Sequence, residues 1–214
     1  MKTPRTLRRR VPRERNGPST EGRILHAAEN LFARHGFDGV SINQLAAEAK
    51  VTIGALYHHF SSKEALYAAA TKRVFTAKSH PPPEVLQPKG TARTRLVRLV
   101  AWFVGAMVLD RNFGLLLRRE FMDPRPSTPA LAGEDIFAAQ LTLCRDLLGQ
   151  LLPGANSDEA VAIMLALLFG FTNMKGLRAV LPGIGKDFDR PEVIAERVVG
   201  LLVHGLRVRK AARR

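Results

Sequence analysis

Apolar residues recur at intervals of three and four along almost the whole chain, and segments bearing proline or glycine separate the runs. That interval places apolar side chains on one face of a helix, whereas a half-buried strand would alternate apolar and polar residues. The chain shows no such alternation and no repeat of fixed length. Because hydrophobic residues make up 46% of the chain, its helices can bury a sizeable core. The sequence therefore predicts an all-α fold.

Start and stop signals divide the chain further. The first four helices are expected at about 20–35, from Ser41, at 52–59 and from Ser61 to about 79, with capping boxes at Ser41–Gln44 and Ser61–Glu64. Prolines at 81–83 end the fourth helix. Longer helices are expected at about 91–110, 112–122, 130–151, 157–180 and 191–210. We therefore predict a basic arm over 1–18, one domain over 19–79 and a larger helical domain over 80–214.

The charge balance points to a polyanionic partner. The chain has 33 Lys and Arg against 19 Asp and Glu, and a sequence pI of about 11.0. Such an excess fits nucleic acid or an anionic membrane surface. The arm alone carries seven basic residues against one glutamate, so it is either a solvated tail or a reader of the DNA minor groove.

Several function classes lack support in the sequence. No nucleophile–base pair, glycine-rich phosphate loop or metal-ligand spacing occurs, so we expect no enzyme, no cofactor and no metal. The adjacent His58 and His59 point about 100° apart on a helix and have no carboxylate or cysteine cluster beside them. Cys144, the sole cysteine, is expected to be a buried hydrophobe. The longest apolar run, 161–171, is shorter than the roughly 20 residues that a bilayer requires, so a soluble cytoplasmic protein without a membrane partner is expected.

The segment from Ser41 to Phe60 has the pattern of two short helices joined by a tight turn at 49–51. Leu56 and Phe60 lie four residues apart and can face a core, which leaves the other face of the second helix exposed. That face carries small and mixed polar residues, and Gly54 lets another molecule approach closely. Such a helix suits the DNA major groove, which is about 12 Å wide. A helix-turn-helix is therefore predicted, the alternative being an ordinary helical hairpin in a core.

The same stretch carries a characteristic series of residues. They are Ala27-Ala28, Leu31-Phe32, Gly36-Phe37, Val40-Ser41, Ile42, Leu45-Ala46, Ala49, Val51-Thr52, Gly54, Leu56-Tyr57, His59-Phe60 and Lys63-Glu64-Ala65-Leu66. With this series, residues 22–66 resemble the N-terminal domain of the TetR (tetracycline-repressor-like) family of bacterial regulators. Lys50 departs from the family pattern, which has glycine in the turn. The resemblance implies an Ω-shaped homodimer in which three N-terminal helices bind a palindromic operator on double-stranded DNA. It also implies that the larger domain dimerises and binds a small-molecule effector that relieves repression.

The predicted DNA contacts lie on both helices of the motif and at the start of the next. Tyr57 and Lys63 are assigned to phosphates, the alternatives being a core aromatic and a solvated lysine. Ile53 and Ala55 cannot donate a bidentate hydrogen bond to a base and are assigned to thymine methyl groups. Alternatively, Ile53 packs inward and DNA shape gives specificity. The complete predicted set is Ser41, Lys50, Thr52, Ile53, Gly54, Ala55, Tyr57, His58, His59 and Lys63.

The larger domain offers candidates for an effector cavity, although simple core packing explains the same residues. The candidate ligand-binding residues are Trp102, Phe103, Met107, Phe121 and Asn173, and Arg118, Glu120 and Thr172 are further polar candidates. The helix at 157–180 is apolar nearly all round, so it needs a second cover. With the helix at 191–210 it is expected to form a two-fold, four-helix dimer interface. A non-specific architectural or membrane-binding protein remains the alternative to a sequence-specific regulator.

Overall fold

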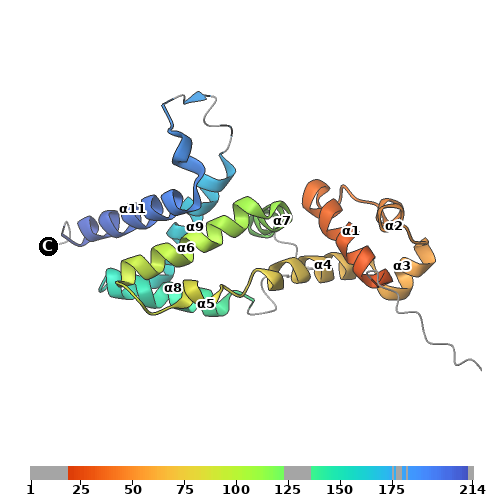
Figure 1. Ribbon diagram of the computed structural model, residues 1–214, viewed down its shortest axis with the longest axis horizontal. Helices are drawn as coiled ribbons and strands as arrows, with labels where there is room; N and C mark the ends of the chain where they lie inside the picture. The colour runs from red at the N-terminus through yellow and green to blue at the C-terminus, as the bar shows by residue number, and fades with distance from the viewer. Residues whose placement is uncertain (1–18, 123–135, 175, 177–179, 182, 212–214) are drawn as a thin grey trace, which may run out of the picture.

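The computed structural model describes residues 19–122, 136–174, 176, 180–181 and 183–211, and all regular structure in these residues is helical. Its elements are α1 (Thr20–His35), α2 (Ile42–Ala49), α3 (Ile53–His59), α4 (Lys63–Ala77), α5 (Pro83–Leu86), α6 (Ala92–Leu109), α7 (Arg111–Met122), α8 (Ala138–Leu151), α9 (Ser157–Asn173), the short 3₁₀ helix η1 (Lys186–Asp189) and α11 (Pro191–Ala211). Figure 1 shows two lobes, with α1–α3 in one, α6, α8, α9 and α11 in the other, and α4 leading from the first to the second. The all-α prediction is confirmed.

The N-terminal lobe is built around α1, which packs against α2, α4 and α7. Ser19 starts this helix because its side chain accepts a hydrogen bond from the Gly22 N–H. Phe32, Leu45 and Leu56, one from each of the first three helices, are fully buried. This shared core fixes α2 and α3 relative to α1 and so sets the direction in which α3 faces solvent.

The core of the N-terminal lobe extends into the second half of the chain. Met107, Phe113, Leu116 and Leu117, from α6 and α7, belong to the same buried cluster as Phe32 and its neighbours. The proposed domain division at residue 79 therefore lies within a continuous packing arrangement, and the division itself stays a prediction. Movement of α7 would be felt in the N-terminal core, because close-packed interiors transmit displacement.

Polar contacts from α7 also join the second half of the chain to α1 and α4. Arg119 donates from its guanidinium to the backbone carbonyls of Ala33 and Arg34, at the C-terminal end of α1. Tyr67 on α4 donates its hydroxyl to a carboxylate oxygen of Glu120 across 2.7 Å, and both residues are buried. Each of these contacts runs from α7 to a helix of the N-terminal lobe.

The C-terminal lobe is a helical bundle with its own core. α6 lies along α11, and α8 and α9 complete the packing around them. Buried residues from all four helices form one cluster, for example Leu99, Leu148, Leu168 and Val198. One side of each long apolar helix is buried here, whereas Ile163 and Leu167 on α9 are only half-buried and Leu201 on α11 is exposed.

Several predicted helix bounds differ from the structure. The fourth helix is capped by Ser62, whose side chain accepts from the Ala65 N–H, so the predicted capping box at Ser61–Glu64 is wrong by one residue. α8 begins at Ala138 rather than near 130, although residues 123–135 lie outside the described residues. α9 ends at Asn173 rather than near 180. The short helices α5 and η1 were not predicted, and the basic arm at 1–18 lies outside the described residues.

No single helix in the described part of the chain is long and apolar enough to span a membrane. Helices α6 and α7 meet the length and composition criteria only when taken together, and they are bent by 104° at the break between them.

Candidate DNA interface and ligand cavity

Helix α2 is closed at both ends by local hydrogen bonds. At its start, the Ser41 side chain accepts from the Gln44 N–H at 3.2 Å, and the Gln44 side chain accepts from the Ser41 N–H at 2.7 Å. This confirms the predicted capping box. At its end, Lys50 adopts φ 54° and ψ 50°, and the Val51 N–H donates to the Ala46 carbonyl at 2.9 Å. That pattern is a Schellman motif with a lysine in its left-handed position.

Helix α3 follows directly from this turn. Thr52 caps it by accepting a hydrogen bond from the Ala55 N–H at 3.1 Å, so its hydroxyl makes the capping contact. Leu56 and Phe60 are buried, as predicted. Because these two residues hold α3 against the lobe, the remaining face of the helix is directed away from the core.

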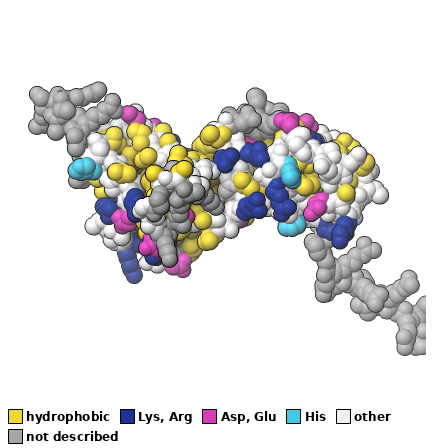
Figure 2. Space-filling view, turned by 90° about the horizontal axis from the view of Figure 1, so that it is seen from above, with side chains coloured by type: hydrophobic (Ala, Val, Ile, Leu, Met, Phe, Trp, Pro, Cys, Tyr) yellow, Lys and Arg dark blue, Asp and Glu magenta, His cyan; other side chains and the backbone are white. Residues whose placement is uncertain are grey.

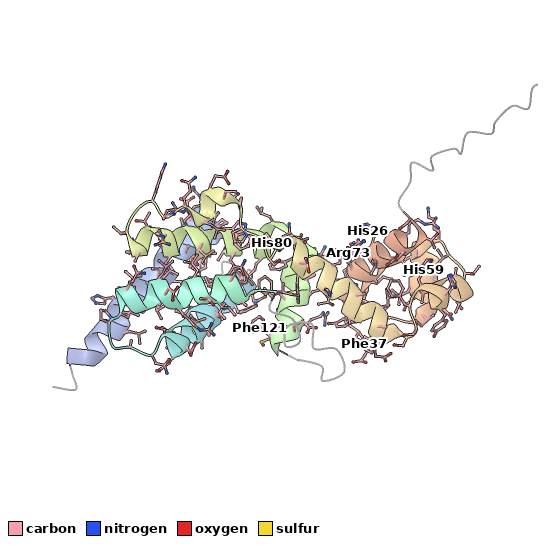
Figure 3. All side chains as sticks on the ribbon, turned by 90° about the horizontal axis from the view of Figure 1, so that it is seen from below. His26, Phe37, His59, Arg73, His80 and Phe121 are labelled. Carbon is pink, nitrogen blue, oxygen red and sulfur yellow. The ribbon has the colours of Figure 1, made fainter. Side chains whose placement is uncertain are left out.

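The outer face of α3 holds most of the predicted DNA contacts. Ile53 is 44% exposed and Tyr57 48% exposed, so neither packs into the core. The other exposed residues of the predicted set are Ser41, Lys50, Thr52, Gly54, His58 and His59, whereas Ala55 and Lys63 are half-buried. His59 lies at the far end of the N-terminal lobe (Figure 3). Eight of the ten predicted residues are therefore exposed, most of them on or next to α3, and their contacts with DNA stay a prediction.

Gly54 faces open space. A Cβ added there would meet only the Thr52 hydroxyl oxygen, at 4.0 Å. Nothing in the fold of this lobe therefore requires glycine at this position, and its helical backbone does not need it either. A glycine that the fold does not need is the residue that lets another backbone or a base edge come closest.

Lys63 has a neighbour that the sequence did not reveal. Its ammonium nitrogen lies 4.3 Å from the centroid of the Phe37 ring, which favours a cation–π contact. The contact holds the lysine at the start of α4, next to α3. Figure 2 shows Lys, Arg and His side chains gathered on the N-terminal lobe, in line with a surface that attracts phosphates.

An ion pair between the exposed Arg73 and the buried Glu29 fixes α4 to α1. Arg73 donates through Nε to Glu29 Oε1 at 2.6 Å and through a terminal nitrogen to Oε2 at 3.1 Å. Figure 3 shows Arg73 beside His26, on the side of α1 that faces α4. This two-point contact adds geometric specificity to the packing of the two helices. Sequence reasoning missed it because the partners are 44 residues apart and neither belongs to a motif.

The C-terminal lobe contains a cavity of about 580 Å³ between α6, α7, α8 and α9. That volume lies within the range of small-molecule sites. Of the predicted ligand-binding residues, Trp102, Phe103 and Phe121 line it, and Figure 3 shows Phe121 at the junction of the lobes. The complete lining is Leu99, Val100, Trp102, Phe103, Leu117, Glu120, Phe121, Phe137, Ala138, Gln140, Leu141, Cys144, Arg145, Met164, Leu165 and Leu168.

Two of the predicted ligand-binding residues lie elsewhere. Met107 is buried in the core of the N-terminal lobe, because α6 leaves the cavity before its last turn and runs toward Phe113. Asn173, at the end of α9, accepts a hydrogen bond from Arg118 at 3.4 Å and ties α9 to α7. Neither residue is among the described residues that line the cavity.

The cavity wall is mostly apolar, with a few polar groups. Glu120, already noted as a polar candidate, is only 6% exposed. Gln140 and Arg145 are additional polar lining residues that helical periodicity alone could not single out. Burial raises the pKa of the Cys144 thiol to about 12, so this sulfur stays protonated and behaves as a hydrophobe, as expected.

Comparison with known proteins places this arrangement in a family. Residues 24–70 match the family model described as bacterial regulatory proteins, tetR family. The HTH-type transcriptional repressor Rv3405c of Mycobacterium tuberculosis is 32% identical over 173 residues, which cover 78% of this chain and 79% of that protein.

Solved structures share the fold at lower sequence identity. A TetR-family transcriptional regulator from Bordetella parapertussis aligns with a TM-score of 0.64 at 23% identity, over 85% of this chain and 93% of that one. The transcriptional regulator FadR from Bacillus subtilis, in complex with stearoyl-CoA, aligns with a TM-score of 0.66 at 17% identity, over 86% and 97% of the two chains. From the matched helix-turn-helix and the long alignment to the mycobacterial repressor, this chain belongs to the TetR family of bacterial DNA-binding transcriptional regulators.

Proposed function

We propose that this protein is a repressor whose α3 reads a palindromic operator in the major groove. The main support is the exposed outer face of α3, whose opposite face is anchored to the lobe by the buried Leu56 and Phe60. Tyr57 and Lys63 hold phosphates, which orient the protein without reading sequence. Ile53 and Ala55 contact thymine methyl groups, because neither side chain can hydrogen-bond to a base edge. The mycobacterial relative Rv3405c is described as a transcriptional repressor, which supports repression rather than activation.

The repressor acts as a homodimer through α9 and α11. Leu201 on α11 is 60% exposed, and Ile163, Leu167 and Phe171 on α9 are only half-buried. An apolar stripe on two adjacent helices is covered most simply by the same stripe of a second copy. The two-fold axis of such a dimer sets two copies of α3 on an inverted repeat, with half-sites about one helical turn or somewhat more apart.

The cavity in the C-terminal lobe is the effector site. Its lining includes Glu120 on α7, the helix that contacts both α1 and α4. A ligand that repositions α7 would therefore shift the N-terminal lobe and lower operator affinity, by binding one arrangement better than the other. The protein performs no catalysis, and it acts in the cytoplasm, where the bacterial chromosome lies.

A selection from random duplexes tests this function. The purified protein should enrich an inverted repeat, and bulk genomic DNA should compete poorly against the selected duplex. Replacing each preferred thymine by uracil, which removes only the methyl group, should weaken binding at the thymines opposite Ile53 and Ala55. A selection that enriches no repeat, with equal competition by bulk DNA, would instead identify a non-specific architectural protein.

A further inference from the structure

Lys63 and Tyr67 share one aromatic neighbour, Phe37. The two residues lie four positions apart on α4, which places them one turn apart on the same face of the helix. Figure 3 shows Phe37 beside α4 on the N-terminal lobe. The Lys63 ammonium nitrogen lies 4.3 Å from the centroid of the Phe37 ring, and the Tyr67 ring meets that ring edge-on, with centroids 5.4 Å apart. Phe37 therefore contacts both the lysine assigned to a DNA phosphate and a residue of the core.

The position of Tyr67 is fixed in turn by α7. Tyr67 is 2% exposed and packs edge-on against Phe32, with ring centroids 5.0 Å apart. Its hydroxyl donates to Glu120 Oε1 across 2.7 Å. Because a hydrogen bond to a carboxylate is stronger than one between neutral groups, this bond limits the positions that the Tyr67 ring can take. A displacement of Glu120 would therefore change how the Tyr67 ring meets Phe37.

Helix α7 also contacts the segment immediately before Phe37. The Arg119 guanidinium donates to two backbone carbonyls in the last turn of α1. It lies so close to Gly36 that a Cβ added there would meet one of its nitrogens at 2.7 Å. Two adjacent residues of α7 thus reach Phe37, Arg119 through the backbone before it and Glu120 through Tyr67. A shift of α7 would be felt at Phe37 by both contacts, because close-packed side chains transmit displacement.

Glu120 lines the cavity as well, so the carboxylate that holds Tyr67 belongs to the same wall that a ligand would meet. We propose that Phe37 and Tyr67 position Lys63 for an operator phosphate, and that Glu120 makes this position depend on what the cavity contains. This inference rests on the proposed function, in which Lys63 binds a phosphate and the cavity is the effector site. A lysine that is held in place before binding loses less freedom when it meets DNA. A ligand that draws Glu120 away from Tyr67 releases Lys63 and lowers operator affinity.

Phe37→Leu tests the positioning of the lysine, because leucine keeps an apolar side chain and lacks the ring face. Ordering one free lysine side chain at an interface lowers affinity by a factor of about two to ten, and a dimer carries two such lysines. Operator affinity, measured by fluorescence anisotropy on the selected repeat, should therefore fall at least about fivefold. Phe37→Tyr retains a ring and should retain most of the affinity. The control Phe75→Leu removes a buried ring about three turns further along α4 and should bind the repeat normally.

Double-mutant cycles show whether these residues act through Lys63 rather than through general stability. Lys63→Ala should weaken operator binding by itself, and adding Phe37→Leu should then weaken it by no more than about twofold. Tyr67→Phe removes the hydroxyl that reaches Glu120, and Glu120→Leu removes the acceptor. Each should lower operator affinity at least about threefold, and neither should lower it further once Lys63 is alanine.

Two safeguards keep the cycles interpretable. Glu84→Gln, on the exposed α5, controls for the loss of one carboxylate and should leave operator affinity unchanged. If Phe37→Leu or Glu120→Leu does not fold, Tyr67→Phe decides the proposal, because it keeps the ring and its packing and removes a single oxygen atom.

The outcomes separate this inference from the proposed function. Full affinity in Phe37→Leu, or a loss of the same size with and without Lys63, would overturn the positioning role and leave α3 as the reader of the operator. A loss in Phe37→Leu but in neither Tyr67→Phe nor Glu120→Leu would overturn the link to the cavity. Full affinity in Lys63→Ala would overturn the phosphate contact of the proposed function, on which the inference rests.

Discussion

Replacing Lys50 with glycine separates the backbone role of the turn from its electrostatic role. Lys50 adopts φ 54°, and it is the only non-glycine residue in the described part of the chain with a positive φ. A left-handed conformation costs a side-chain-bearing residue about 1–2 kcal/mol. Glycine avoids that cost but loses about 0.5–1 kcal/mol more backbone entropy on folding. The expected net result is a stabilisation of about 0.5–1 kcal/mol.

The same substitution should weaken DNA binding. If Lys50 holds a phosphate in each half-site, the dimer loses two such contacts. The slope of log affinity against log salt should then become shallower by about 1.8, at about 0.9 per lost contact. Differential scanning calorimetry should record a melting temperature higher by about 1–4 °C, given about 2–4 °C per kcal/mol for a chain of this size. The protein thus becomes more stable and a poorer DNA binder at once.

Lys50→Asn is the matched control, because asparagine tolerates the left-handed conformation and lacks the charge. It should reproduce the shallower salt slope. A melting temperature that falls in the glycine variant would refute the strain argument, since the Schellman motif would then prefer lysine. A salt slope unchanged in both variants would refute the phosphate contact and leave Lys50 with no role beyond the turn.

Close approach of DNA at α3, the dimer interface and the buried Tyr67 hydroxyl can each be tested by substitution. Gly54→Ala should retain or raise stability by up to about 1 kcal/mol and lower operator affinity at least about tenfold. Gly149→Ala on α8, where a Cβ would lie at an ordinary contact distance of 3.5 Å from the Ser157 hydroxyl oxygen, should leave affinity unchanged. Equal operator affinities of the two variants would contradict close approach of DNA at α3. Leu201→Glu should yield monomers in sedimentation, because Leu201 lies in the proposed dimer interface of α9 and α11. The control Leu109→Glu, at an even more exposed leucine on α6, should stay dimeric. A dimeric Leu201→Glu variant would exclude the α9–α11 interface. Burial, together with a hydrogen bond to a carboxylate, raises the pKa of Tyr67, so the folded state should lose stability as pH rises above the unfolded value of about 10. Urea unfolding at pH 8 and pH 11 should show a smaller alkaline loss for Tyr67→Phe than for the unmodified protein, and equal losses would refute the assignment.

The sequence predicted the helix-turn-helix well because its signals are local. The capping pair Ser41 and Gln44 lies three residues apart, and Leu56 and Phe60 lie four residues apart, so each pair is specified within one helical turn. The start of α4 was predicted one residue too early, because Ser61 and Glu64 have the spacing of a capping box, whereas Ser62 has Ala65 at that distance. Burial of Leu66 and Tyr67 in the structure accompanies a start one residue later, with Ser62 as the cap.

The contacts that join the lobes could not be predicted in the same way. Tyr67 and Glu120 are 53 residues apart, and each occurs on a helix whose periodicity explains only its apolar face. For Met107, the sequence predicted burial but not the residues that it packs against. Met107 fits the apolar pattern of α6 along with Trp102 and Phe103, yet it lies in the last turn of that helix, which extends past the cavity into a different core. Periodicity identifies which residues are buried, but the crossing of helices decides what they are buried against.

The central claim is that this protein recognises a DNA sequence rather than DNA in general. Fluorescence anisotropy titrations at about 150 mM salt measure this most directly, with the selected inverted repeat and a scrambled duplex of the same length and composition. The repeat should bind at least about 1,000-fold more tightly than the scrambled duplex. A ratio near one, at this salt concentration and at lower ones, would contradict it.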